Sequence, residues 1–235
     1  MPLSSIEPRR LYRQIADQIR ELIVRGEFVP GARLPPERDL AKQLGVSRPS
    51  VREALIALEV EGLVDVRIGS GIYVLGGGDG GVAPPEVQSA MGPFELLRAR
   101  SVIESECAAL AARHAKRAQL AAIADALQQM EAVAGAEHRQ PLAGDRLFHL
   151  RIAEATGNGA LVAVVKLLWD ERTGPLFARL EHHYDSPEQW ARAIAEHRLV
   201  LEAIGRHDAS GARAAMQRHL DRAYKRFSRS WDAKH

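Results

Sequence analysis

The chain has 235 residues, of which 46% are hydrophobic and 26% charged, and this composition excludes a disordered or collagen-like protein. The length suits one large or two ordinary domains, and 32 basic against 30 acidic residues leave the net charge too close to neutral to indicate a nucleic-acid partner by itself. We expect a cytoplasmic protein with no membrane partner, because no apolar run approaches about 18 residues, no signal-peptide pattern is present, and the single cysteine, Cys107, cannot form an intrachain disulfide.

Three helices are predicted at the N-terminal end. An apolar stripe predicts a helix over residues 11–23, which Gly26 and the following turn residues end. A second, shorter helix is predicted over residues 37–44. After a tight turn, Ser47 occupies the N-cap position of a third helix over residues 48–61. The last two of these helices form a helix-turn-helix.

The segment after the third helix predicts a β-hairpin. Residues 63–68 and residues 72–75 have the composition of short strands, and a Gly-Ser-Gly turn lies between them. This hairpin would form a wing beside the helix-turn-helix.

The predicted third helix carries side chains that suit DNA recognition. A helix-turn-helix places the N-terminal end of its second helix against base edges in the major groove. Four residues lie at that end here: Ser47, Arg48, Ser50 and Arg52. A guanidinium can bond O6 and N7 of guanine together, which is worth about 1–3 kcal/mol of base discrimination. Arg38, at the start of the preceding helix, could reach a phosphate or a base, or could instead form a surface salt bridge with Glu37 or Asp39.

A glycine-rich segment divides the chain. Five of residues 76–81 are glycine, and two prolines follow shortly afterwards. We therefore expect a mainly α protein: an N-terminal winged helix-turn-helix (α+β) over residues 1–75, a flexible linker over residues 76–92, and an all-α helical bundle over residues 93–235.

Four polar residues interrupt the apolar stripes of the predicted bundle. Asp145 and His149 share the inner face of one helix, and His197 and His219 take core positions on two others. A single histidine at such a position is more often hydrogen-bonded within a core. A buried carboxylate together with three imidazoles instead indicates a site for a divalent metal. We predict a metal site with zinc as the default ion, and nickel or manganese would accept the same ligands.

A second group of residues indicates an effector site. Arg100 lies in an apolar stripe and needs an anion, which could be Glu104 one turn on or the carboxylate of a bound ligand. Arg172 repeats this pattern, and Trp169 beside it offers a flat wall of the kind that packs against sugar rings. Asn158 is either a turn residue or a further contact.

The remaining histidines lack this registration and are expected at the surface or in loops. They are His114, His138, His182, His183, His207 and His235, with His182 and His183 kept as candidates for a pocket rim.

The N-terminal segment resembles the winged helix-turn-helix of the GntR family of bacterial transcription regulators. The resemblance is carried by residues 34–41, 46–55 and 61–64. It implies that four residues meet the operator: Arg38, Arg48, Arg52 and, at the tip of the wing, Gly69. One departure is Pro36, where many members carry serine, and proline suits the first position of a helix.

The C-terminal segment resembles the FCD domain of FadR-like GntR regulators, a bundle of six or seven helices, over most of residues 93–231. This resemblance implies metal ligation by the four polar residues named above, and it matches Arg100 to an arginine that grips a carboxylate. Four shorter segments, residues 7–12, 69–72, 92–97 and 168–172, are similar to the repressors of hexuronate utilisation. The implied effectors are uronic acids.

Together these features predict a homodimeric repressor that binds a palindromic operator and changes its DNA affinity when a small carboxylate binds at the metal. Two alternatives remain open. One is a metal-dependent hydrolase fused to a DNA-binding module, although neither a general base nor a nucleophile motif accompanies the ligands. The other is an effector-independent DNA binder in which the metal is purely structural.

Overall fold

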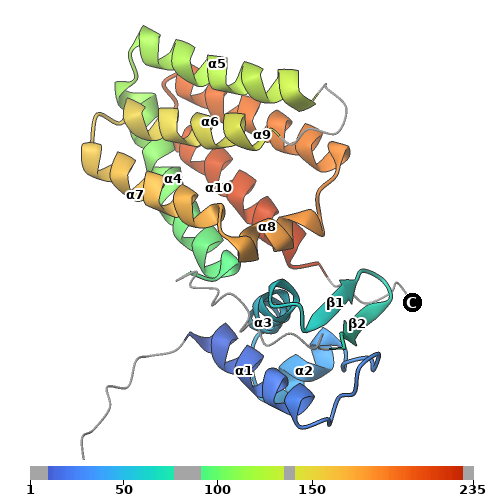
Figure 1. The fold of residues 1–235 in the computed structure, drawn as a ribbon. Helices are drawn as coiled ribbons and strands as arrows, with labels where there is room; N and C mark the ends of the chain where they lie inside the picture. The colour runs from blue at the N-terminus through green and yellow to red at the C-terminus, as the bar shows by residue number, and fades with distance from the viewer. Residues whose placement is uncertain (1–9, 77–90, 135–140, 230–235) are drawn as a thin grey trace, which may run out of the picture. The chain divides into compact units, whose positions relative to one another are not determined.

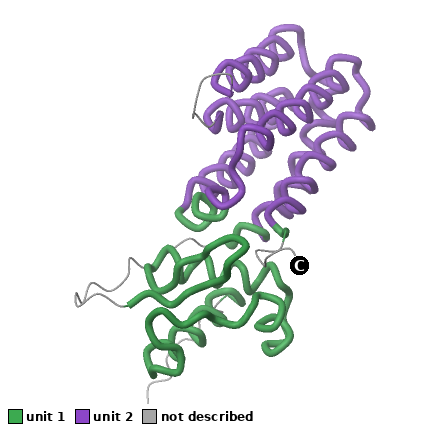
Figure 2. Tube along the Cα trace, turned by 90° about the vertical axis from the view of Figure 1, so that its right-hand side faces the viewer, with its two compact units in different colours: residues 1–94, 175–180, 228–235 green, residues 95–174, 181–227 purple. Residues whose placement is uncertain are grey.

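The computed structural model describes residues 10–76, 91–134 and 141–229, which divide into two compact units (Figure 2). Unit 1 comprises residues 1–94, 175–180 and 228–235, and unit 2 comprises residues 95–174 and 181–227. Most of the predicted linker, residues 77–90, lies outside the described residues.

Unit 1 contains the predicted helix-turn-helix. Its helices are α1 (Leu11–Val24), α2 (Glu37–Leu44) and α3 (Arg48–Val60). Helix α1 buries Ile15 and Ile19 and packs against α3. The turn between α2 and α3 needs a left-handed residue, which Gly45 provides with φ 65°. Ser47 then accepts a hydrogen bond from the backbone N–H of Ser50 at 3.3 Å, so the predicted N-cap of α3 is confirmed.

The wing is a two-stranded antiparallel sheet of β1 (Val64–Arg67) and β2 (Gly71–Val74). The register pairs Val64 with Val74 and Arg67 with Gly71. The hairpin turn reverses through Gly69, whose φ of 78° is costly for any other residue. Glu59 of α3 accepts the backbone N–H of Val66 at 3.1 Å and so attaches the wing to the helix.

The remaining helices are α4 (Pro93–His114), α5 (Arg117–Ala134), α6 (Leu142–Ala155), α7 (Gly159–Arg172), α8 (Pro175–His182), α9 (Pro187–Gly205) and α10 (Ala209–Phe227). Helix α5 packs against α6 and α9, α6 also packs against α7, and α9 packs against α10 (Figure 1). Over the described residues, these helices confirm the predicted all-α bundle. None of the described helices is both long enough and apolar enough to cross a membrane.

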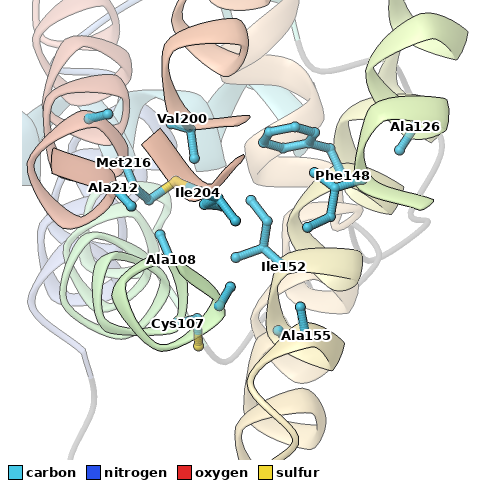
Figure 3. Packing of buried hydrophobic residues seen from close by; sticks show 14 of the residues in the cluster. Cys107, Ala108, Ala126, Phe148, Ile152, Ala155, Val200, Ile204, Ala212 and Met216 are labelled. Atoms are coloured by element: carbon cyan, nitrogen blue, oxygen red, sulfur yellow. The ribbon is translucent and has the colours of Figure 1, made fainter. Parts of the chain in front are cut away.

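The core of unit 2 forms where the apolar faces of these helices meet. Figure 3 shows Ala108 of α4, Ile152 of α6, Ile204 of α9 and Met216 of α10 in this cluster, and all four are at most 1% exposed. Because α6, α9 and α10 all contribute to this core, polar residues on their inner faces must also come together there.

Candidate functional site

The four predicted metal ligands converge inside unit 2. Asp145 and His149 lie one turn apart on α6, His197 lies on α9, and His219 lies on α10. Their exposed fractions are 6%, 1%, 0% and 6%, respectively. Each therefore occupies the interior position that its place on an apolar stripe predicts.

The distances between these residues suit one metal ion. Nε2 of His149 lies 3.1 Å from Nε2 of His197, and Oδ1 of Asp145 lies 3.2 Å from the latter and 3.6 Å from the former. One donor atom from each residue, His219 included, falls within 4.8 Å of all the others. Buried Oδ1 of Asp145 accepts no well-aligned hydrogen bond among the described residues. One carboxylate and three imidazoles fit a divalent ion, so the cluster can hold one.

The electrostatics favour metal ligation at two of the three histidines. At His149 burial opposes protonation, but Glu104 and Asp145 outweigh it and raise its pKa. Burial lowers the pKa of His197, and burial together with the neighbouring histidines lowers the pKa of His219 well below its usual range. Both imidazoles are therefore neutral and keep a lone pair for a ligand bond. Burial opposes ionisation of Asp145, but His149, His197 and Arg172 outweigh it and hold its pKa well below the ordinary value.

Two glutamates each contact Nδ1 of one of the histidines. Oε2 of Glu104 lies against Nδ1 of His149, and Oε2 of Glu196 lies 2.9 Å from Nδ1 of His219. Sequence reasoning considered Glu104 only as a partner of Arg100, and it missed Glu196. The spacing of four residues between Arg100 and Glu104 was a signal in the sequence that the two side chains share a helix face. No signal in the sequence indicated that Glu196 contacts a histidine on another helix.

The predicted effector residues Arg100, Trp169 and Arg172 lie beside the cluster. The guanidinium carbon of Arg100 is 4.1 Å from the centroid of a ring of Trp169, and that of Arg172 is 4.8 Å from it. The indole of Trp169 is itself 5.1 Å from the His149 ring, and its buried N–H has no hydrogen-bond partner among the described residues. Arg172 contacts Asp145 at 3.4 Å, so this group adjoins the ligand set directly.

Both arginines already have protein partners. Nε of Arg100 donates to Oε1 of Glu104 at 2.7 Å, which is the salt bridge that the sequence left open as an alternative. Nη2 of Arg172 donates to Glu181 at 2.7 Å. A ligand carboxylate at this site would therefore share or replace existing ion pairs.

The structure gives Asn158 the role of a turn residue. Its side-chain oxygen accepts the backbone N–H groups of Ala160 and Leu161 and so forms the N-cap of α7. Of the other histidines, His114, His182 and His207 are exposed, His183 is half-buried, and His138 and His235 lie outside the described residues.

In unit 1, several predicted DNA-binding residues lie at the surface. The side chain of Arg38 is 76% exposed and that of Arg48 is 42% exposed, although Nε of Arg48 also donates to Glu37 at 2.9 Å. Ser47 and Ser50 share a hydrogen bond of 2.8 Å at the start of α3. Gly69 lies at the turn of the wing. These residues are available for a nucleic-acid contact.

Arg52 is different, and here the structure does not support the predicted base contact. Its side chain is only 1% exposed and is held by Glu37, which is equally buried, through Nε at 2.9 Å and Nη2 at 2.5 Å. Arg52 lies one helical turn after Arg48 on α3, at a point where α3 packs against α2. In this conformation Arg52 joins the two helices of the motif instead of facing a groove.

A winged helix-turn-helix joined to a helical unit defines a class of protein: a DNA-binding regulator with a second, all-helical domain. The model of the bacterial regulatory proteins of the gntR family matches residues 11–74, and the FCD domain model matches residues 95–222. The chain belongs to the gntR family and carries an FCD domain. It is a DNA-binding transcription regulator and not an enzyme, because its relatives are regulators.

Two relatives named as regulators of the Uxu operon and of the Exu regulon match most of the chain. The Uxu operon transcriptional regulator of Escherichia coli strain K12 is 40% identical over 229 residues, which cover 95% of this chain and 89% of the relative. The Exu regulon transcriptional regulator of the same strain is 39% identical and covers 92% and 83%. The solved structure of E. coli McbR/YncC has a TM-score of 0.51 at 24% identity, covers 93% of this chain and 97% of that chain, and supports the fold alone.

Proposed function

We propose that this regulator is a repressor whose FCD domain binds a divalent metal ion through Asp145, His149, His197 and His219, and that a small carboxylate bound beside the metal changes its affinity for DNA. The observation that carries this proposal is the convergence of four buried donor atoms within 4.8 Å. Four such groups come from three helices and lie in an apolar core. Hydrophobic side chains would stabilise that core better, so a purely structural role does not explain the polar groups. When bound, the metal would supply a positive centre that attracts an anionic ligand.

The proposed effector is a uronic acid. Two guanidiniums, Arg100 and Arg172, offer forked donors to a carboxylate. The N–H of Trp169, which has no partner within the part of the chain that the structure describes, offers a donor to a hydroxyl group. A sugar acid carries both groups on one molecule. The names of the Uxu and Exu relatives agree with this choice.

The proposed DNA partner is a palindromic operator bound by a homodimer, because two winged helices related by a two-fold axis read two half-sites. The operator would be contacted by Arg38, Arg48 and Ser50. Gly69 would let the wing come close to the sugar-phosphate backbone of the DNA. Coupling of about 1–3 kcal/mol between effector and operator binding would change the operator affinity 5–150-fold.

Metal content tests the carrying observation. Elemental analysis of the purified wild-type protein should find one zinc, nickel or manganese ion per chain. His197→Ala should lower this content strongly, whereas His182→Ala, which changes an exposed histidine outside the cluster, should not. A wild-type protein without metal after reconstitution with zinc, or a His197→Ala protein with full occupancy, would contradict the proposal.

Chelation separates the proposal from a purely structural metal. The core of unit 2 contains many buried apolar residues besides the ligands, so we expect the metal-free protein to keep its helical circular dichroism spectrum. Loss of the helical signal on chelation would instead favour a structural ion.

A further inference from the structure

We propose that Glu104 is a positioning residue that fixes the imidazole of His149 for metal binding and couples it to Arg100. This inference rests on the proposed metal site and assigns a role to a residue that ligates nothing itself.

Each oxygen of Glu104 contacts a different partner. Oε1 accepts from Nε of Arg100 at 2.7 Å, and Oε2 lies against Nδ1 of His149. All three side chains are at most 3% exposed, so water does not compete for these contacts. The carboxylate therefore joins the arginine to the histidine in one buried chain.

The contact with Glu104 determines which nitrogen of His149 faces the metal. The carboxylate oxygen and the imidazole nitrogen form a close ion-pair contact without hydrogen-bond alignment. Because a carboxylate can only accept, it favours the tautomer of His149 whose proton is on the nitrogen beside it. That nitrogen is Nδ1, which leaves Nε2 directed at Asp145 and His197, 3.6 Å and 3.1 Å away. Second partners of this kind orient metal-bound histidines and raise their basicity.

The same arrangement occurs a second time. Glu196 places Oε2 at 2.9 Å from Nδ1 of His219, and its other oxygen accepts from Arg222 at 3.0 Å. Two of the three histidines thus share one pattern: an arginine donates to one oxygen of a glutamate, and the other oxygen of that glutamate contacts Nδ1 of the histidine. The recurrence on other helices argues that the pattern serves the ligands, since a chance salt bridge in a core would not repeat at the next histidine.

The two pairs differ in what the arginine can do. The side chain of Arg222 is 60% exposed, whereas Arg100 is buried and stacks on Trp169 at 4.1 Å. Arg100 is also the proposed carboxylate-binding residue. A ligand drawn to Arg100 would therefore act on His149 through Glu104, which provides a physical connection between the effector and the metal.

The test is the zinc affinity of the full-length protein, measured by competition with a chromogenic chelator. Glu104→Gln keeps the size of the side chain, but an NH2 group, which donates, replaces one of the two oxygens. Because each oxygen faces a different partner, either Arg100 or His149 then meets a donor in place of its acceptor. We expect zinc to bind about 10–100-fold more weakly. The matched control is Glu106→Gln on the same helix, an exposed residue paired with Arg213, and it should bind zinc as the wild type does.

A double-mutant cycle tests the coupling. Arg100→Met should weaken zinc binding in the wild-type background and have little further effect in the Glu104→Gln background, because its influence passes through Glu104. Additive effects of the two substitutions would overturn the coupling. Unchanged zinc affinity of a folded Glu104→Gln protein would overturn the positioning role.

A measurement on the unmodified protein covers the case in which Glu104→Gln fails to fold. Nitrogen-15 NMR of the zinc-loaded wild type should find Nδ1 of His149 protonated and Nε2 bound to the metal, and an unprotonated Nδ1 would overturn the inference. If the wild type bound no zinc at all, the proposed metal site would fail instead, so the two failures are distinguishable.

Discussion

The buried ion pair between Arg52 and Glu37 makes a direct prediction about stability. Both side chains are 1% exposed, and two nitrogens of Arg52 contact the same carboxylate oxygen. Arg52→Met removes the charge but keeps much of the volume, and it leaves Glu37 buried with Arg48 as its remaining partner among the contacts described above. Loss of one member of a buried pair costs about 3–5 kcal/mol. Because Arg48 still compensates part of the charge, we expect the lower end of that range.

A loss of about 3 kcal/mol is large for a unit of this size, since a small domain shifts its melting temperature by about 4–8 °C per kcal/mol. We therefore expect unit 1 of Arg52→Met to melt on the order of 10 °C or more below the wild type. Hydrogen exchange followed by mass spectrometry would localise the change to α2 and α3, and calorimetry would give the shift. The control is Arg38→Met, whose side chain is 76% exposed and whose melting should change little. If Arg52→Met melted like the wild type and lost only DNA binding, the structural role assigned to Arg52 would be refuted.

Three further predictions concern other parts of the chain. Arg38→Ala should weaken binding to a duplex selected by the wild-type protein by about 1–3 kcal/mol with unchanged melting, and an unaltered gel shift would remove Arg38 from the interface. Burial beside Glu104 raises the pKa of Cys107 to about 12, so at pH 8 the folded protein should resist iodoacetamide while the denatured protein reacts; equal labelling in both states would show that the thiol is accessible. Gly69→Ala should destabilise the wing by roughly 1 kcal/mol because φ is 78° there, and unchanged hydrogen exchange in β1 and β2 would contradict this.

Local signals in the sequence predicted the elements of the fold. Ser47 as an N-cap and the tight turn before it are decided by neighbouring residues, and the structure has both, with Gly45 in the left-handed conformation at the turn. The fold class and the family are likewise confirmed. The inward direction of Asp145 and His149 follows from helical spacing alone, which is why their helix face could be read without coordinates.

Contacts between separate helices could not be predicted in the same way. The burial of Arg52 depends on Glu37, 15 residues away on α2, and spacing along one helix contains no information about it. Glu196 was missed for the same reason, because its partner His219 belongs to the next helix. Arg100 was ambiguous since both a protein carboxylate and a ligand carboxylate satisfy a buried guanidinium.

The central claim is that the metal cluster and the neighbouring arginines together sense a sugar acid. Thermal shift of the zinc-loaded protein with glucuronate and galacturonate, compared with glucose as the control without a carboxylate, tests it most directly. At a ligand concentration of 100 times Kd, binding adds about 2.7 kcal/mol of stability, which is a readily measured rise in melting temperature. The account predicts this rise for a uronate with the metal-loaded protein and its absence with the folded protein after chelation. An equal rise with and without metal, or with glucose, would contradict it.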